Sequence, residues 1–297
     1  MYHNPVLLTK SVDGLAINPD GIYVDVTFGG GGHSRAILKQ LKEGKLIGFD
    51  QDADALNNVP DDDRFIMISQ NFRYLKNFLR LHGIEKVDGI LADLGVSSHQ
   101  FDQAERGFST RFEADLDMRM NRGQENSATD IINTYSQEDL IRIFTDYGEI
   151  KSSYRLAKAI CEQREKEEIK TTSSLNTIIG EIFPPTRINK FQAMVYQALR
   201  IEVNSELEVL KSFLEQTSDV LAPGGRLVVI SYHSLEDRLV KNFIRSGNFQ
   251  GKIEKDFFGQ HLVSFKSITS KPIIPDEEEI IENNRARSAK MRIAEKL

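Results

Sequence analysis

The sequence predicts an α/β protein with a doubly wound, Rossmann-like sheet that carries an inserted helical domain. Three observations predict it. A strand, a glycine-rich turn and a helix follow one another over residues 21–41, a second strand ends in a carboxylate at Asp50, and strand character returns at residues 226–231 after a long helical stretch. Strand, glycine-rich turn and helix form the opening unit of nucleotide-binding doubly wound folds.

The glycine-rich turn, Asp25-Val-Thr-Phe-Gly-Gly-Gly-Gly-His-Ser34, matches neither common phosphate-binding motif. His33 stands where a P-loop has its lysine, and Arg35 replaces the third glycine of the dinucleotide fingerprint. Asp50 follows at about the 20-residue distance from which an acid accepts ribose hydroxyls. An adenosine cofactor without pyrophosphate fits best, and we infer S-adenosylmethionine. The alternative is a tight turn with a structural role only.

The other elements follow from hydrophobic periodicity. Strands are expected at residues 64–69, 87–93 and 226–231, the last preceded by a helix through Leu221 and a turn at residues 223–225. Helical spacing covers residues 72–82, 136–147, 153–166, 173–183 and 191 onward, and Ser136 with Asp139 has the spacing of a helix-capping box. We therefore predict a sheet domain in two parts, residues 1–105 and 201–297, around a helical insertion at residues 106–200.

The composition narrows the class of protein. The 297 residues are 40% hydrophobic and 28% charged, as in ordinary globular proteins. With no secretion signal and no apolar run near the roughly 18 residues that span a bilayer, we expect a cytoplasmic protein that does not enter a membrane. Cys161 is the single cysteine, which excludes a disulfide framework and a cysteine-based zinc site, and we expect no bound metal. The net charge of −6 leaves nucleic acid binding to local basic patches.

Ligands of open parallel sheets bind beyond the carboxyl ends of the strands. That rule places residues 29–33, Asp50, Phe72 and Asp93 along one edge. Asp93 suits an adenine amino group, a methionyl ammonium or the substrate, and capping of the next helix is its alternative role. Phe72 suits packing on adenine, with plain core packing as the alternative.

The lone thiol bears on the reaction type. Methylation at a ring carbon of cytosine needs a thiolate nucleophile. Cys161 lies in a helix of the insertion, where we expect a buried small hydrophobe. Direct transfer to a nitrogen or oxygen needs only positioning and proton acceptors. Tyr232 and His233, after the returning strand, are candidates for stacking on a base and moving a proton, although Ser234 with Asp237 also fits a simple helix start.

The chain resembles the bacterial 16S ribosomal RNA (cytosine-N4)-methyltransferase family, which modifies cytidine 1402 in the decoding centre of the small ribosomal subunit. The blocks that carry the resemblance run in order along essentially the whole chain. They are His3-Asn-Pro-Val-Leu-Leu8, the glycine-rich turn, Asp93-Leu-Gly-Val-Ser-Ser-His-Gln-Phe-Asp102, Arg106-Gly-Phe-Ser109, Leu116-Asp-Met-Arg-Met120, Ala198-Leu-Arg-Ile-Glu-Val-Asn-Ser-Glu-Leu207, His233-Ser-Leu-Glu-Asp-Arg238 and Asn284-Arg-Ala-Arg-Ser-Ala-Lys290.

The resemblance implies S-adenosylmethionine as the cofactor, and by position it implies a set of contacts: Gly31, Gly32, His33, Asp50, Phe72, Asp93 and Gln100. It also implies a methyltransferase sheet interrupted by a helical domain. The chain departs from the family at Phe183-Pro-Pro-Thr-Arg-Ile-Asn-Lys190, where the family has a His-Pro-Ala-Thr-Arg run. That departure falls in the insertion, so it affects the expected docking of RNA and leaves the expected cofactor contacts unchanged.

RNA contacts are expected at two basic clusters. Arg106 and Arg119 stand near Phe108 and Phe112, and basic groups interleaved with aromatics suit a single-stranded or flipped base. A C-terminal cluster holds Arg285, Arg287 and Lys290, for which a solvated terminal segment is the alternative. The expected partner is 16S RNA within the small subunit, and the sequence does not predict an oligomeric state.

Two other functions remain open from the residues alone. A nicotinamide-dependent oxidoreductase would use the same opening unit, although the missing third glycine weighs against it. A non-catalytic RNA or assembly factor would keep the cofactor pocket only as scaffold, and the presence of Asp50, Asp93 and Gln100 weighs against that.

Overall fold

The computed structural model describes residues 5–297, so His3 and Asn4 of the N-terminal block lie outside the described residues. The chain divides into two compact units, and each is described by itself. One unit joins Met1–Gly95 to Leu207–Leu297, and the other is Val96–Glu206. The boundaries differ from the predicted residues 106 and 200 because Val96 and Phe101 pack on the helical core and α9, Ile188–Asn204, continues that core.

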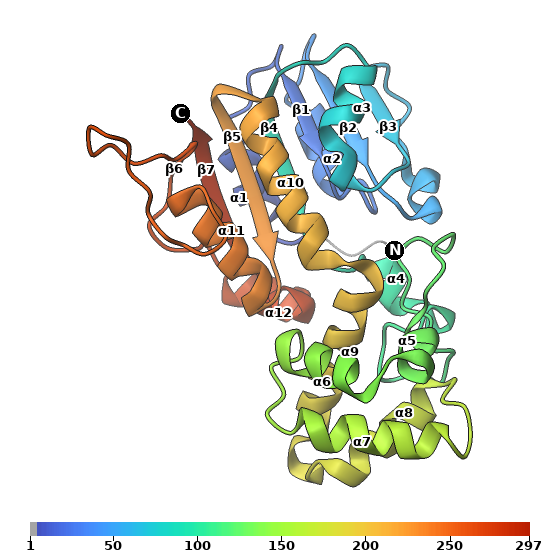
Figure 1. Cartoon of the computed structure of the whole chain (residues 1–297). Coiled ribbons are helices and arrows are strands. Elements are labelled where there is room, and N and C mark those ends of the chain that lie inside the picture. The colour runs from blue at the N-terminus through green and yellow to red at the C-terminus, as the bar shows by residue number, and fades with distance from the viewer. Residues whose placement is uncertain (1–4) are drawn as a thin grey trace. The chain divides into compact units, whose positions relative to one another are not determined.

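The first unit is built on a seven-stranded sheet in the order β3-β2-β1-β4-β5-β7-β6. The first five strands of that order are parallel, while β7 is antiparallel to both of its neighbours. The predicted doubly wound α/β fold is therefore confirmed (Figure 1). The strands are β1 Ile22–Asp25, β2 Lys45–Phe49, β3 Phe65–Ile68, β4 Val87–Asp93, β5 Leu221–Ser231, β6 Phe265–Ser267 and β7 Lys290–Lys296.

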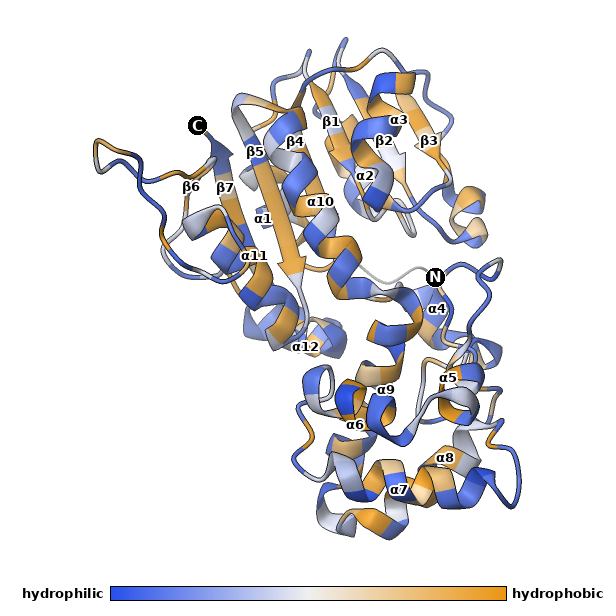
Figure 2. Cartoon of the chain, in the orientation of Figure 1, coloured by the Kyte–Doolittle hydropathy of each residue, from blue (hydrophilic) through white to orange (hydrophobic). Residues whose placement is uncertain are grey.

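Helices cover both faces of this sheet because successive strand residues point to opposite sides. In β4, Ile90 and Ala92 belong to one core and Leu91 to the other. Helices α1, Leu8–Gly14, and α2, Gly32–Leu38, pack on the face of Leu91. Helices α3, Leu75–Leu81, α10, Glu206–Val220, and α11, Ser234–Ser246, pack on the other. Strand β5, buried on both faces, is apolar along most of its length (Figure 2).

Two details near β5 differ from the prediction. The strand begins at Leu221, directly after α10, rather than after the turn at residues 223–225. Its pairing with β4 steps from Val87↔Leu221 to Gly89↔Arg226, so residues 222–225 bulge out of the ladder. The residues predicted to form a turn therefore lie in a bulge inside β5 rather than before the strand.

The C-terminal residues are part of the sheet rather than a solvated segment. Strand β7 pairs with β5 along its length, and Met291, Ile293 and Ala294 are buried. Arg292 donates to both carboxylate oxygens of Asp237 on α11 at 2.7 and 3.1 Å, which ties the strand to that helix. Short elements complete this unit: η1 Ala53–Asn58, η2 Phe72–Tyr74, α12 Glu277–Glu282 and η5 Asn284–Ser288.

The second unit is helical and has its own core, centred on buried side chains such as Leu140, Phe144 and Leu199. Ser136 accepts the amide of Asp139 at 3.0 Å, which confirms the predicted start of α6. Cys161 is partly buried against this core from α7. The unit consists of α4 Ser98–Asp102, η3 Ala104–Arg106, α5 Ala128–Thr134, α6 Gln137–Asp146, α7 Ser153–Arg164, α8 Thr172–Ile182, η4 Pro185–Arg187 and α9.

Among residues 5–297, no helix combines the length and the apolar composition that crossing a membrane requires.

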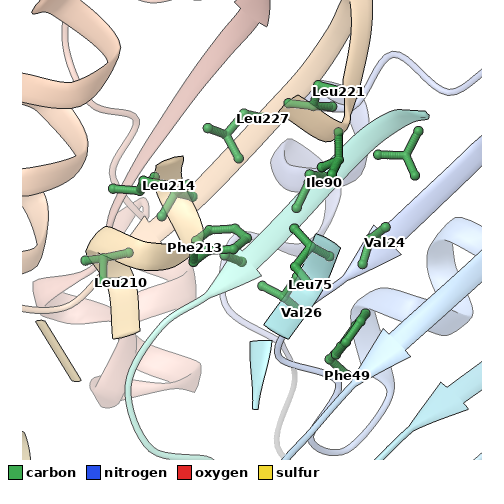
Figure 3. Close-up of a cluster of buried hydrophobic side chains, with 14 of the residues drawn as sticks. Val24, Val26, Phe49, Leu75, Ile90, Leu210, Phe213, Leu214, Leu221 and Leu227 are labelled. Carbon is green, nitrogen blue, oxygen red and sulfur yellow. The ribbon is translucent and has the colours of Figure 1, made fainter. Parts of the chain in front are cut away.

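The packing of α10 on the sheet gives a stability prediction. Phe213 is fully buried at the centre of the core in Figure 3 and meets the ring of Phe72 edge-on at 5.2 Å between centroids. Phe213→Ala should lower the free energy of unfolding by about 3–5 kcal/mol, because it removes a ring and leaves a cavity. Chemical denaturation followed by circular dichroism measures the change.

The matched control is Phe257→Ala, the same substitution at a ring that is 98% exposed. Its effect should stay within about 0.5 kcal/mol. Equal losses in the two variants would contradict the assignment of Phe213 to the core.

Candidate active site

Three carboxylates of the first unit lie at the carboxyl edge of its sheet. Asp25 ends β1, Asp50 directly follows β2, and Asp93 ends β4. Strands β2, β1 and β4 are adjacent and parallel, so their carboxyl ends meet at the same edge. Ligands of doubly wound sheets bind at this kind of edge, where the chain connections change direction between β1 and β4.

Asp50 is held by backbone amides on both of its oxygens. Gly29 N donates to Oδ2 at 2.8 Å, and Asp52 N donates to Oδ1 at 2.9 Å. Burial raises the pKa of Asp50 to about 6, although these two hydrogen bonds favour the charged form. The bond from Gly29 also links the glycine-rich turn directly to the end of β2.

Asp93 is held from two strands. Its backbone amide donates to Oγ1 of Thr27 at 2.7 Å, and its carboxylate Oδ1 accepts the hydroxyl of Tyr232 at 2.7 Å. Burial raises the pKa of Asp93 to about 6, against the effects of nearby His33 and of the bond from Tyr232. The alternative role of Asp93 as a helix cap is not observed, because Ser97 caps α4.

Asp25 and His33 are the buried polar residues next to these carboxylates. Asp25 Oδ2 accepts the hydroxyl of Ser34 at 2.7 Å, and burial raises the pKa of Asp25. The His33 ring lies with Nε2 3.1 Å from the carbonyl oxygen of Val6 and Nδ1 3.9 Å from Asp93 Oδ2. Since the His33 ring is buried among protein groups, a ligand would meet His33 through its backbone.

Tyr232 and His233 are positioned by a buried glutamate. Glu236 Oε2 accepts the amides of Tyr232 and His233 at 2.9 and 3.3 Å, and its Oε1 lies 3.2 Å from His233 Nε2. The cap of α11 is therefore His233, and the predicted start at Ser234 with Asp237 is wrong by one residue. The reason is that Glu236 stands three residues after His233, in the position that completes a capping box.

The glycines at the turn are required by packing within the chain itself. Gly31 has φ +73°, and a Cβ there would lie 2.9 Å from the ring of Phe28. A Cβ on Gly32 would lie 2.1 Å from Pro5 Cγ. The space beside these two glycines is thus filled by this protein's own side chains, so close approach of a ligand is not needed to explain them.

Two other predicted cofactor residues, Phe72 and Gln100, do not belong to the group of carboxylates at the strand ends. Phe72 lies in η2 after β3, half-buried against Phe213, so the structure supports its role in the core. Gln100 belongs to the helical unit, where its Oε1 accepts the amide of Ser97 at 3.1 Å within the cap of α4. Its contact with a cofactor stays a prediction.

The predicted RNA contacts divide by exposure. Arg106 is fully buried, and its Nη2 donates to the carbonyls of Arg119 and Met120 at 3.0 Å each, so this guanidinium cannot reach a phosphate in the present structure. Arg119 is committed to Asp117 at 2.6 and 3.1 Å. Both arginines therefore organise the helical unit.

The C-terminal cluster lies at the site edge of the sheet. Lys290 pairs with Ser231 at the carboxyl end of β5, immediately before Tyr232. Arg285 and Arg287 precede it in η5, with Arg285 half-buried and Arg287 exposed. The antiparallel pairing of β7 thus brings basic residues from the end of the chain to the edge that carries Asp93.

Comparison with known proteins identifies the family. The model of the MraW methylase family matches residues 1–297. The chain is 60% identical to ribosomal RNA small subunit methyltransferase H of Flavobacterium johnsoniae over 297 residues, covering 100% of this chain and 98% of that protein. Proteins of the same name from Christiangramia forsetii and Bacteroides thetaiotaomicron are 59% and 57% identical, covering 100% and 99% of this chain and 98% and 97% of theirs.

The chain belongs to the MraW methylase family. The resemblance inferred from the sequence blocks is confirmed.

The carboxylate edge of this methylase fits a cationic cofactor. Burial raises the pKa values of Asp25, Asp50 and Asp93, which means that their negative charges are incompletely compensated by the protein. S-adenosylmethionine carries a sulfonium and an ammonium group, so its charge complements the edge. Residues with strongly shifted pKa values in one place are typical of functional sites.

Sequence reasoning missed three residues that shape the site, namely Asp25 at the end of β1, Glu236 and Thr27. Glu236 was passed over because the cap was assigned to Ser234, although its spacing from His233 was the available signal. Thr27 holds the end of β4 through its hydroxyl, and no pattern within one strand shows a bond to another strand.

The Tyr232–Asp93 contact gives a titration prediction. Its hydrogen bond favours the charged carboxylate, so Tyr232→Phe should raise the pKa of Asp93 above its value of about 6. Carboxyl ¹³C resonances followed over a pH titration measure the shift. Tyr74→Phe, at an exposed ring, is the control and should leave the value unchanged. An unchanged or lower pKa in Tyr232→Phe would show that the bond is absent in solution.

Proposed function

We propose that this methylase transfers a methyl group from S-adenosylmethionine to the exocyclic N4 of cytidine 1402 in 16S RNA of the small ribosomal subunit, directly and without a covalent intermediate. The names of relatives up to 60% identical over the full chain support the class of substrate. The observation that carries the chemistry is the hydrogen bond between Tyr232 and Asp93 at the carboxylate edge. Because ribosomal subunits work in the cytoplasm, that substrate implies a cytoplasmic enzyme.

Cofactor binding is assigned to the edge between β1, β2 and β4. Asp50 is oriented by two amides and retains lone pairs for the two ribose hydroxyls. Gly31, Gly32 and His33 would contribute backbone groups, and Phe72 and Gln100 complete the set implied by the family. When bound, S-adenosylmethionine supplies a methyl group on a sulfonium that a nucleophile can displace.

The protein's part in the reaction is to position the amine and accept its protons. The lone pair of a cytosine N4 is delocalised into the ring, so accepting its N–H bonds favours a pyramidal nitrogen aimed at the methyl. The Tyr232 hydroxyl donates to Asp93, which leaves its oxygen as an acceptor. The methylated nitrogen can give its proton to Tyr232 Oη while the hydroxyl proton of Tyr232 moves to Asp93, whose raised pKa favours protonation once the sulfonium charge is gone.

The helical unit is proposed to recognise RNA, together with Arg285, Arg287 and Lys290 at the site edge. Arg106 supports that unit from its core, and the partly exposed Arg119 supports it through its ion pair with Asp117. The thiol of Cys161, partly buried in its core, takes no part in the proposed transfer.

The function is tested by radiolabelled methyl transfer to purified small subunits from cells that lack the modification. We expect N4-methylcytidine at the single position 1402 after nuclease mapping and mass spectrometry, with Cys161→Ser still active. Methyl groups on a ring carbon or on a ribose oxygen, or a covalent adduct between the protein and RNA, would contradict the proposed transfer.

Alanine substitutions at different site residues should affect cofactor affinity and turnover to different extents. Asp50→Ala should weaken S-adenosylmethionine binding by about 1.5–3 kcal/mol, the usual loss for charge-assisted hydrogen bonds. Tyr232→Ala and His233→Ala should lower turnover much more than cofactor affinity, while Asp93→Ala lowers both. Calorimetry and single-turnover kinetics measure the two quantities.

Asp63→Ala removes an exposed carboxylate from the chain and serves as the charge control for Asp50→Ala. A folded Asp50→Ala protein that binds as tightly as this control would remove Asp50 from the cofactor site.

A further inference from the structure

A small hairpin of the first unit, residues 251–264, connects α11 to β6. Lys255 and His261 pair across it, Leu262 N donates to the carbonyl of Glu254 at 2.9 Å, and Asp256 N donates to the carbonyl of Gln260 at 2.8 Å. The loop extends away from the sheet in Figure 1. These bonds give the hairpin a defined shape, although it contributes little to either core.

The tip is ordered by one carboxylate. Asp256 Oδ1 accepts the amides of Phe258 and Gln260 at 2.8 Å each, and Gly259 closes the turn with φ +82°. An aspartate that accepts amides just ahead of it in the chain is a standard way to fix a tight turn. The backbone at the tip is therefore held by hydrogen bonds to Asp256.

Those residues are Phe257 and Phe258, which are 98% and 85% exposed. They are the most exposed large hydrophobic side chains among residues 5–297. Their rings meet edge to face, at 88° and 5.7 Å between centroids, and most of both rings stays exposed to solvent. Neither phenylalanine belongs to a hydrophobic core, and exposed apolar groups of this kind mark interaction sites.

The flanks of the tip favour a nucleic acid partner. Lys252, Lys255 and His261 are exposed on the hairpin, and Lys266 is exposed at the start of β6. Of the two acids in the hairpin, Asp256 is directed at tip amides, which leaves Glu254 as the acid on the surface. Aromatic faces interleaved with cations are the arrangement that binds single-stranded nucleic acid, since every base has a face to stack and each phosphate can meet a cation.

The hairpin is remote from the carboxylates. Phe265, where β6 begins, pairs with Lys296, and Glu295 pairs with Arg226 near the start of β5. The hairpin therefore joins the sheet at the end opposite to Asp93. A contact here cannot act on the reacting base and belongs to a second region of a large substrate.

We propose that Phe257 and Phe258 stack on unpaired bases of small-subunit RNA and serve as a docking contact separate from the methyl transfer site. The proposal rests on the proposed function for the identity of the substrate. A hydrophobic pocket of a ribosomal protein is the competing partner, and it differs in one property: it accepts any apolar side chain of similar volume, whereas stacking requires an aromatic face.

Paired substitutions at both positions distinguish these partners. Phe257→Ala with Phe258→Ala removes the rings, Phe257→Leu with Phe258→Leu keeps apolar volume without an aromatic face, and Phe257→Tyr with Phe258→Tyr keeps the face. Equilibrium binding to small subunits and the KM for subunits are measured, with cofactor affinity and kcat as internal controls. Leu81→Ala, at a side chain that is 76% exposed on α3, is the matched surface control.

We expect the alanine and leucine pairs to weaken subunit binding and to raise KM by about tenfold or more, because each stacked base is worth roughly 1–3 kcal/mol. The tyrosine pair and Leu81→Ala should behave as the wild type, and kcat and cofactor affinity should not change. A leucine pair that binds as the wild type would identify a protein pocket and overturn the proposal. So would an alanine pair without effect, or self-association through the tip.

The two proposals fail separately. A wild-type protein that binds subunits through the rings but transfers no methyl group to them would overturn the proposed function alone. An active wild type whose subunit binding is indifferent to the alanine pair would overturn the docking contact alone.

Discussion

The site depends on one physical constraint, the crowding of three carboxylates where β1, β2 and β4 end, with Asp25 buried and Asp50 and Asp93 partly buried. Burying a charge is costly unless it is paired, and backbone amides, hydroxyls and the nearby His33 compensate Asp25, Asp50 and Asp93 only in part. The raised pKa values of all three record the remaining cost. A cationic cofactor would supply the missing positive charge. The electrostatic cost that the carboxylates carry in the cofactor-free protein would then be relieved when S-adenosylmethionine binds, which favours binding.

Most of the sheet could be predicted because parallel strands are buried on both faces and appear as short apolar runs. The strand that ends at Asp93 is an example, with neighbouring residues in two different cores. Strand β7 was not predicted, because polar and apolar residues alternate only over Lys290-Met-Arg-Ile293 before Glu295 and Lys296 follow in succession. Strand β6 is only three residues long, which is too short for any periodicity.

Site residues could be predicted where the position of a strand end determines them. They could not be predicted where a contact between distant parts of the sequence determines them. Asp50 and Asp93 follow from the position of strand ends, whereas the hydroxyl of Tyr232 reaches Asp93 across 139 positions of sequence. Arg106 shows the opposite error. A charged residue next to aromatics suggested RNA, but its guanidinium is fully buried and holds two carbonyls of the helical unit. Charge pattern alone does not distinguish a surface cation from one that organises a core.

Proton linkage tests the central claim most directly, because it reports the charge of the edge itself. Calorimetric titration with S-adenosylmethionine near pH 6, in buffers of different ionisation enthalpy, counts the protons exchanged on binding. Asp50 and Asp93 have pKa values of about 6 in the free protein, so each is partly protonated there, and a cationic ligand should lower both values. The account predicts net release of protons on binding and an affinity that rises from pH 5 to pH 7. Binding near pH 6 with no proton exchange, or with uptake, would contradict it.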